Sequence, residues 1–163
     1  MAEIPIAGLL YYLYQTPVLR ENAVSLDFSA ARETMIDSQL KTVGVIDRAL
    51  LDAIAAVPRE RFLPAGMAGL AYADAEPELA PQTSPGRSLL VPMVLALLLQ
   101  TAGVRRGERV LVVGSATGYS AAVLDAMGAI VTALESDPAL AAAALVPTMT
   151  GPLHEGWAAN APY

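Results

Sequence analysis

The residues whose types and spacing could do chemistry lie between positions 110 and 135. In "VLVVGSATGYSAAVL", residues 110–124, a β-branched run leads into Gly114 and Gly118 and then into a run of small residues. Glu135 follows a second apolar run, 21 positions after Gly114. In a doubly wound sheet, the amides of such a turn face a nucleotide-like ligand, and an acidic residue ending the next strand accepts hydrogen bonds from ribose hydroxyls. The pattern therefore predicts a cofactor site.

The residues alone leave two interpretations of this pattern open. In the first, the glycines only allow a tight turn between a strand and a helix, and Glu135 is solvated at the end of its strand. In the second, the turn binds a cofactor. Ala116 then stands where the middle glycine of a dinucleotide site would be, which favours a cofactor without phosphates, such as S-adenosylmethionine.

The sequence around the turn predicts the elements that must position it. Strands alternate with helices, which is typical of an α/β protein with a parallel sheet. The expected elements are a buried strand at 109–113, a helix at 119–127 ended by Gly128, a second strand at 129–134, a short helix starting at Asp137 and Pro138, and a third strand at 146–150.

The preceding part of the chain predicts a helical region. Apolar residues at helical spacing indicate a helix over 28–40, with Asp27 or Ser29 as its cap. Asp47 caps a second helix, which Pro58 ends. Residues 58–91 hold five prolines and predict a long loop, and Pro92 starts an apolar helix that Gly103 closes.

Composition excludes several function classes. The net charge of −6 argues against a nucleic-acid partner. With no cysteine, a reducing compartment such as the cytoplasm is expected. His154 is the only histidine, which removes most zinc sites and any Ser-His-Asp arrangement. We expect no transmembrane segment, because the apolar N-terminal stretch is short and Pro17 interrupts it.

Residues 1–26 form an apolar, tyrosine-rich extension. Two interpretations are open here as well. The extension is either an additional helix packed on the domain or a patch for a partner protein or a membrane surface.

Several blocks resemble the protein-L-isoaspartate O-methyltransferase family. They are "RETMIDSQLKTVGVIDRALLDAIAAVPRERFLP", "GRSLLVPMVLALLLQTAG", "GERVLVVGSATGYSAAVLDAMG", "VTALESDPALA" and "GPLHEGWAANAPY", in the family's order. The resemblance implies a Rossmann-like methyltransferase fold, with a helical cap and proline-rich loop in 27–91 and the first half of the sheet domain in 92–163. It also implies that C-terminal strands of the usual seven-stranded sheet are missing.

The resemblance implies a reaction and a set of site residues. The reaction is methyl transfer from S-adenosylmethionine to the carboxylate of isoaspartyl residues in damaged proteins. The cofactor-binding positions are Gly114, Ser115, Ala116, Gly118, Tyr119, Glu135 and Gly151. Ser88 falls on a threonine of the family's loop and could contribute a hydroxyl to catalysis.

Departures from the family pattern support a second hypothesis. Leu90 and Val91 replace a serine and a glutamine of that loop, Val112 replaces an acidic residue before the turn, and Thr150 replaces an aspartate. In the second hypothesis the chain is a non-catalytic subunit, with a partner that covers the open sheet edge or contacts residues 1–26.

Overall fold

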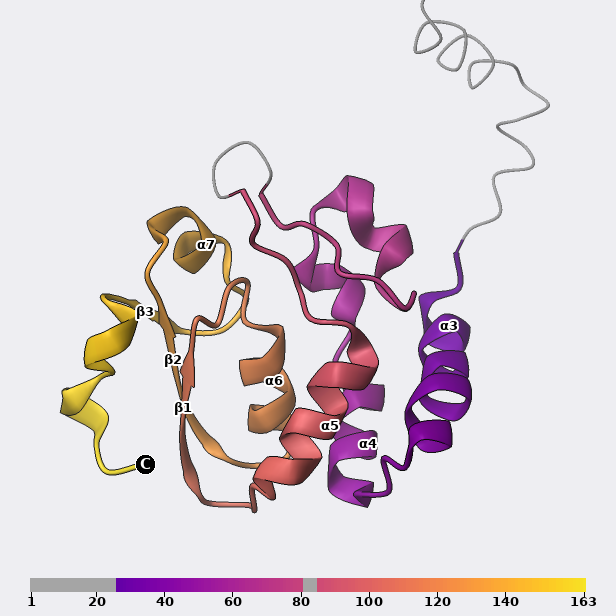
Figure 1. Ribbon diagram of the computed structural model, residues 1–163, viewed down its shortest axis with the longest axis horizontal. Coiled ribbons are helices and arrows are strands. Elements are labelled where there is room, and N and C mark those ends of the chain that lie inside the picture. The colour runs from indigo at the N-terminus through magenta and orange to yellow at the C-terminus, as the bar shows by residue number, and fades with distance from the viewer. Residues whose placement is uncertain (1–25, 81–84) are drawn as a thin grey trace, which may run out of the picture.

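A parallel sheet of three strands is the centre of the computed structural model, which describes residues 26–80 and 85–163 (Figure 1). The strands are β1 (Arg109–Val113), β2 (Ile130–Glu135) and β3 (Thr148–Thr150), in the order β1-β2-β3. Arg109 pairs with Ile130, and Ala133 pairs with Thr148. The predicted α/β class and the parallel sheet are confirmed.

Helices cover one face of this sheet. The helix α6 (Tyr119–Ala126) connects β1 to β2, and α7 (Pro138–Ala143) connects β2 to β3. Figure 1 shows α6, then α5 (Pro92–Ala102) and α4 (Arg48–Ala56), and finally α3 (Phe28–Met35), at increasing distance from the sheet. The apolar core lies between these helices and includes Met35, Leu40, Val45, Leu50 and Val123, each at most 2% exposed.

The residues predicted to begin and end the helices do so in the structure. Asp27, rather than Ser29, caps α3 by accepting hydrogen bonds from the amides of Ser29 and Ala30. Asp47 accepts from the Leu50 amide at 3.0 Å, and Gly103 takes a left-handed conformation after α5. Aspartate caps form because the first amides of a helix have no partner within it.

The helix predicted over 28–40 does not stay regular. After Met35 it continues as a π-helical turn over Ile36–Leu40 and a 3-10 turn over Lys41–Val43. Hydroxyl groups of this stretch donate to the carbonyl oxygen four residues earlier, as in the bonds Ser38 to Thr34 and Thr42 to Ser38. Such bonds compete for helix carbonyls and bend the helix.

One further prediction needs correction, and another is confirmed. The strand at 109–113 is not buried, because β1 pairs with β2 alone within the described residues and Val113 is 50% exposed. Residues 58–91 are irregular in the part that is described, as predicted. They form 3-10 turns over Arg59–Phe62 and Ala65–Leu70 and an antiparallel bridge between Glu78 and Ser88.

A polar cluster ties α3 to the segment after α4. Arg32 Nε donates to the Tyr72 hydroxyl at 2.8 Å, and Arg32 also lies 3.4 Å from Glu60. The Tyr72 hydroxyl donates to Glu60. Burial and this bond to Glu60 raise the pKa of Tyr72 to about 12, so its hydroxyl keeps its proton at neutral pH.

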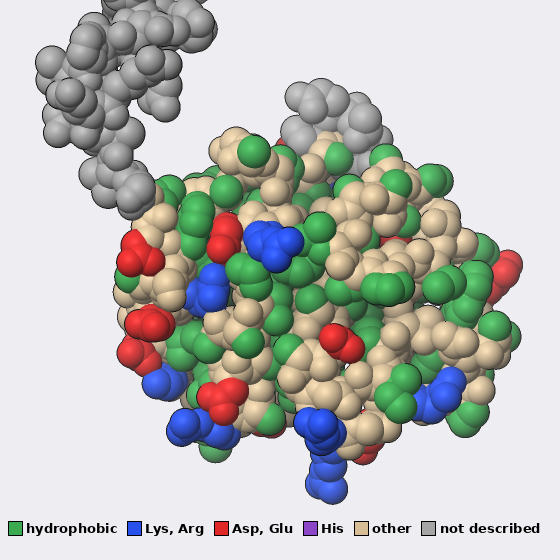
Figure 2. All heavy atoms as spheres, turned by 180° about the vertical axis from the view of Figure 1, so that it is seen from behind, with side chains coloured by type: hydrophobic (Ala, Val, Ile, Leu, Met, Phe, Trp, Pro, Cys, Tyr) green, Lys and Arg blue, Asp and Glu red, His purple; other side chains and the backbone are tan. Residues whose placement is uncertain are grey.

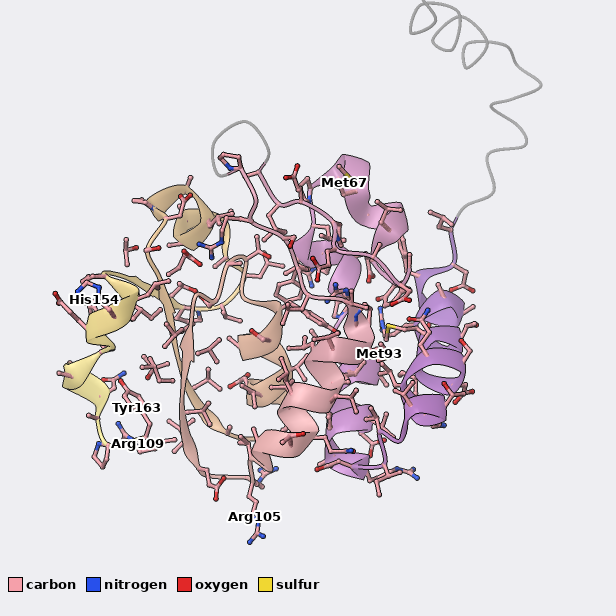
Figure 3. The ribbon with its side chains drawn as sticks, in the orientation of Figure 1. Met67, Met93, Arg105, Arg109, His154 and Tyr163 are labelled. Atoms are coloured by element: carbon pink, nitrogen blue, oxygen red, sulfur yellow. The ribbon has the colours of Figure 1, made fainter. Side chains whose placement is uncertain are left out.

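The C-terminal segment covers the face of the sheet opposite the helices (Figure 1). Asn160 Nδ2 donates to Thr132 Oγ1 of β2 at 2.9 Å, and Arg109 Nε donates to the Pro162 carbonyl at 3.0 Å. Figure 3 shows Arg109 and Tyr163 side by side there, whereas His154 lies at the outer edge of the molecule. The helices and the C-terminal segment therefore lie on opposite faces of the sheet.

Within the described residues, no helix is long and apolar enough to cross a membrane. The two interpretations of the tyrosine-rich extension concern residues 1–26. Of these, residues 1–25 lie outside the described part of the chain. They stay predictions.

Gly118 and Gly44 provide a matched test of the packing beneath the turn. Both have a left-handed φ, +91° and +89°, but a Cβ on Gly118 would lie 2.5 Å from Val146 Cγ2, whereas one on Gly44 would meet nothing within 4 Å. We expect Gly44→Ala to lower the free energy of unfolding by about 1 kcal/mol through backbone strain. Gly118→Ala should cost about 2 kcal/mol more through overpacking. Urea unfolding measures both, and equal losses would contradict the close contact.

Candidate cofactor site

The glycine turn is joined to the end of β2 by backbone hydrogen bonds. The amides of Gly114 and Ser115 both donate to the Leu134 carbonyl, at 2.8 and 3.0 Å. The Gly118 amide donates to the Ser115 carbonyl at 2.8 Å and closes the turn. These bonds need φ of +71° at Gly114 and +91° at Gly118, which glycine adopts without steric cost.

Ala116 is the one non-glycine residue of the described chain with a positive φ, +52°. A side chain in this conformation costs about 1 kcal/mol. The Ala116 amide compensates by donating to Glu135 Oε2 at 2.8 Å. The carboxylate thus holds the turn in the conformation that a middle glycine would take freely.

Glu135 is fully buried at the carboxyl end of β2, where it accepts several hydrogen bonds. Its Oε1 accepts from the amides of Ser136 and Asp137, at 2.8 and 3.0 Å. Its Oε2 accepts from the Ala116 amide and, at 2.5 Å, from Arg87 Nη2. The interpretation of Glu135 as a solvated residue at a strand end is therefore wrong.

The surroundings of Glu135 favour its charged form. Burial by itself raises the pKa of a carboxyl group. Hydrogen bonds from the Asp137 amide, the Arg87 side chain and the Ala116 amide outweigh burial and hold the pKa of Glu135 below its ordinary value of 4.5. Glu135 is therefore an anion at neutral pH.

Arg87 is a site residue that the sequence pattern did not indicate. Its backbone is held by the bond from the Leu79 amide to the Arg87 carbonyl, at 2.8 Å. Its guanidinium passes close to the turn, since a Cβ on Gly114 would lie 4.0 Å from Arg87 Nη2. No spacing rule connects Arg87 with a carboxylate 48 positions later, so only the fold reveals the pair.

The predicted site residues fall into two groups. Ser88, Gly114, Ser115, Ala116 and Tyr119 line one cavity of about 80 Å³, so the structure brings the predicted serine of the loop to the glycine turn. Gly118, Glu135 and Gly151 do not line that cavity.

Gly118 and Gly151 are joined to the site through neighbouring backbone. Gly118 faces Val146, and the Gly151 amide donates to the Glu135 carbonyl at 3.1 Å. The Trp157 ring packs against Gly151, within 3.5 Å of where its Cβ would be. The Trp157 ring therefore packs on the backbone directly after β3.

Comparison with known proteins connects this geometry to a family. The family model described as "Protein-L-isoaspartate(D-aspartate) O-methyltransferase (PCMT)" matches residues 30–163. The chain belongs to this family. The resemblance noted in the sequence and the Rossmann-like fold expected from it are confirmed.

Individual members of the family show the same relationship. The protein-L-isoaspartate O-methyltransferase of Methylorubrum populi is 41% identical over 143 residues, which cover 82% of this chain and 66% of that protein. Protein-L-isoaspartate O-methyltransferase 1 of Rhodopseudomonas palustris is 37% identical, with 90% and 62% covered. A solved protein-L-isoaspartate O-methyltransferase superposes with a TM-score of 0.70 at 26% identity, covering 81% of this chain and 45% of the other. The chain thus spans about two thirds of the length of these curated relatives.

Substitution of Glu135 tests its role in the family turn. Glu135→Gln should lower the free energy of unfolding at pH 7 by about 3 kcal/mol, because Arg87 and the turn lose a buried anionic acceptor. The folded pKa lies below the unfolded one, so the stabilising contribution is complete above pH 4.5 and disappears as pH falls through the folded value. The difference between wild type and variant should therefore shrink below pH 4.5.

Urea unfolding between pH 7 and pH 3 measures this difference. Glu33→Gln is the matched control, because it removes the same charge from an exposed position on α3. A pH-independent difference between wild type and Glu135→Gln would show that the charge of Glu135 does not stabilise the turn.

Proposed function

We propose that the protein is an S-adenosylmethionine-dependent methyltransferase that acts on the carboxylate of isoaspartyl residues in proteins. One observation carries this proposal: Glu135, a buried anion at the carboxyl end of β2, holds the glycine turn that follows β1. The chain that contains this arrangement belongs to the methyltransferase family. In parallel sheets, ligands bind outside the carboxyl ends of the strands.

The residues of the site fit the cofactor. Two buried side-chain donors next to the turn, Ser115 Oγ and Arg59 Nη1, have no hydrogen-bond partner within the described chain. Gly114, Ser115 and Ala116 would hold the amino-acid end of the cofactor, with Tyr119 behind them. Glu135 would hold the ribose, and Gly151 would lie on the adenine side.

The bound cofactor would supply an electrophilic methyl group. The acceptor carboxylate is ionised at neutral pH, so no proton has to move and the side chains of the site need only orient the carboxylate and exclude water. Ser88 is half-buried in the wall of the cavity beside Ser115. We assign it the role of donating a hydrogen bond that orients the acceptor.

Arg87 is the residue that must move when a ribose binds Glu135. A carboxylate offers about four acceptor positions, and two backbone amides on Oε1 with one amide and Arg87 on Oε2 fill them. The amides are fixed by the chain, whereas the Arg87 side chain is 30% exposed. Ribose hydroxyls therefore displace Arg87 rather than an amide.

The remaining parts of the proposal concern location and partners. The absence of cysteine from the sequence supports the cytoplasm as the compartment. On the face in Figure 2, Lys and Arg side chains stand apart among acidic ones, which gives no support to a nucleic-acid partner. The proposed macromolecular partner is a protein or peptide that carries isoaspartyl residues.

Two measurements test the activity. Isothermal titration with S-adenosylhomocysteine should show saturable binding at one site, and the protein should transfer a labelled methyl group to an isoaspartyl peptide but not to the aspartyl form. Binding without transfer would favour the non-catalytic hypothesis. Absence of both would refute the proposed function.

Removal of Arg87 should strengthen cofactor binding. In Arg87→Ala the ribose no longer competes with a guanidinium for Glu135, and we expect S-adenosylhomocysteine to bind about fivefold more tightly, as for the loss of an ion pair of about 1 kcal/mol. Titration calorimetry measures the change. Arg48→Ala removes the same charge from a side chain that is 89% exposed and should change nothing. Weaker binding by Arg87→Ala would show that the guanidinium contacts the ligand instead.

A further inference from the structure

A groove on the helix-covered face of the sheet is separate from the cavity at the glycine turn. Its volume is about 180 Å³. Its lining residues come from α6, from β2 and from the segment just before β3, and they are Ala121, Asp125, Val131, Ala133, Val146 and Pro147. None of them lines the cavity that Ser88 and Ser115 share. The groove therefore does not belong to the cofactor site described above.

The shortness of α7 explains why the groove is open. The helix α7 and the strand β2 each have six residues. Since a helix rises about 1.5 Å per residue and a strand about 3.3 Å, α7 is less than half as long as β2. Figure 1 shows α7 near the carboxyl ends of the strands. It therefore does not extend along the amino-terminal half of β2, where Val131 lies.

The groove has an apolar floor and apolar walls. Ala121 and Ala133 form the floor and are almost completely buried, whereas Val131 and Val146 are half-buried and Pro147 is exposed. The side chains of Val131 and Ala133 lie on the same face of the sheet, because they are two positions apart in one strand. The surface that a ligand would contact is therefore mainly that of the two valines and the proline.

Hydrogen bonds hold the wall that Val146 provides. The Leu145 amide donates to the Thr117 carbonyl at 3.2 Å, which ties this segment to the residue before Gly118. On the other side, Thr148 Oγ1 donates to the Val146 carbonyl at 3.0 Å. The groove is thus formed without a ligand, as is usual for small-molecule sites.

Asp125 supplies a negative charge at the groove. Among the described residues that line the groove, it alone has a polar side chain. It is exposed, and none of the ion pairs formed by the described residues includes it. Asp125 also lies in the last turn of α6, which holds no basic residue and carries the negative end of the helix dipole. Carboxylate and dipole therefore attract a cation to the same place.

We infer that the groove binds a small, free ammonium ion with a compact apolar body. The body packs against Val131 and Val146, and the charged nitrogen pairs with Asp125. Valine and proline side chains offer water no hydrogen bond, so an apolar group that displaces this water gains affinity. An apolar cavity of about 150 Å³ binds benzene, so this groove of about 180 Å³ accommodates a ring of that size. The net charge of −6 adds a long-range attraction for cations.

Titration of cyclohexylammonium into the full chain with ¹³C-labelled valine methyl groups tests the site. We expect saturable NMR shifts at Val131 and Val146, and none at Val113, which is 50% exposed on β1 outside the groove. Methylammonium carries the charge without the apolar body and should cause no saturable shift. Equal shifts with both amines, or none with cyclohexylammonium, would overturn the inference.

Asp125→Asn tests the recognition of charge. The variant should bind cyclohexylammonium about fivefold more weakly, as expected for the loss of one exposed ion pair. Its affinity for cyclohexanol, which has the same ring without a charge, should equal that of the wild type. Asp74→Asn is the matched control, because Asp74 is exposed and lies outside the groove. If Asp125→Asn binds cyclohexylammonium as tightly as the wild type, the groove does not select a cation and the inference is wrong.

Val131→Thr tests the apolar wall. Threonine keeps the shape of valine and its branching at Cβ, which suits a strand, but it places a hydroxyl group against the ring. We expect cyclohexylammonium to bind about fivefold more weakly. Val113→Thr makes the same change at the exposed valine of β1 and should leave the affinity unchanged. An unchanged affinity in Val131→Thr would place the ring elsewhere and contradict the assignment.

A last titration separates the groove from the proposed function. Saturation with S-adenosylhomocysteine should not change the affinity for cyclohexylammonium, because the two cavities have no lining residue in common. Competition between the two ligands would place the ammonium ion at the glycine turn and overturn the inference. If S-adenosylhomocysteine does not bind, the proposed function fails, whereas saturable shifts at Val131 and Val146 still support the groove.

Discussion

The buried carboxylate of Glu135 is the interaction on which the site depends. It joins the glycine turn through Ala116, the start of the segment before α7 through Ser136 and Asp137, and the loop before α5 through Arg87. A buried charge is stable only when each oxygen is hydrogen-bonded, and here three of the donors are backbone amides whose positions follow from the sheet. The backbone at the ends of β1 and β2 therefore fixes the carboxylate, and the carboxylate in turn holds these backbone segments together.

The turn after α4 meets the loop before α5 and the helix α6 through a second buried charge. Arg59 belongs to the turn after α4, yet its side chain reaches the Leu90 carbonyl and the Tyr119 ring of α6. Glu135 has all its acceptor positions occupied, whereas Arg59 retains one unpartnered donor in the described structure.

The departures from the family pattern acquire a physical meaning in this arrangement. Leu90 stands where family members have a serine, but its contribution is the backbone carbonyl that holds Arg59, which any residue type provides. Ala116 stands where a middle glycine would reduce strain, and the hydrogen bond to Glu135 offsets the cost of its left-handed φ. Neither substitution disrupts the turn. Val112, which stands where family members have an acidic residue before the turn, is a half-buried residue of β1.

The sequence by itself determined the order and type of the elements, their caps and the positions of the turn and of Glu135, because these depend on local chemistry. Periodicity, aspartate caps and glycines with positive φ act over a few residues. Only the tertiary structure decided which side chains share a site. Arg87 meets Glu135 across 48 positions, and Arg59 meets Tyr119 although they are far apart in the chain. No local pattern encodes such contacts, since they arise when the segment between α4 and α5 packs against the carboxyl ends of the strands.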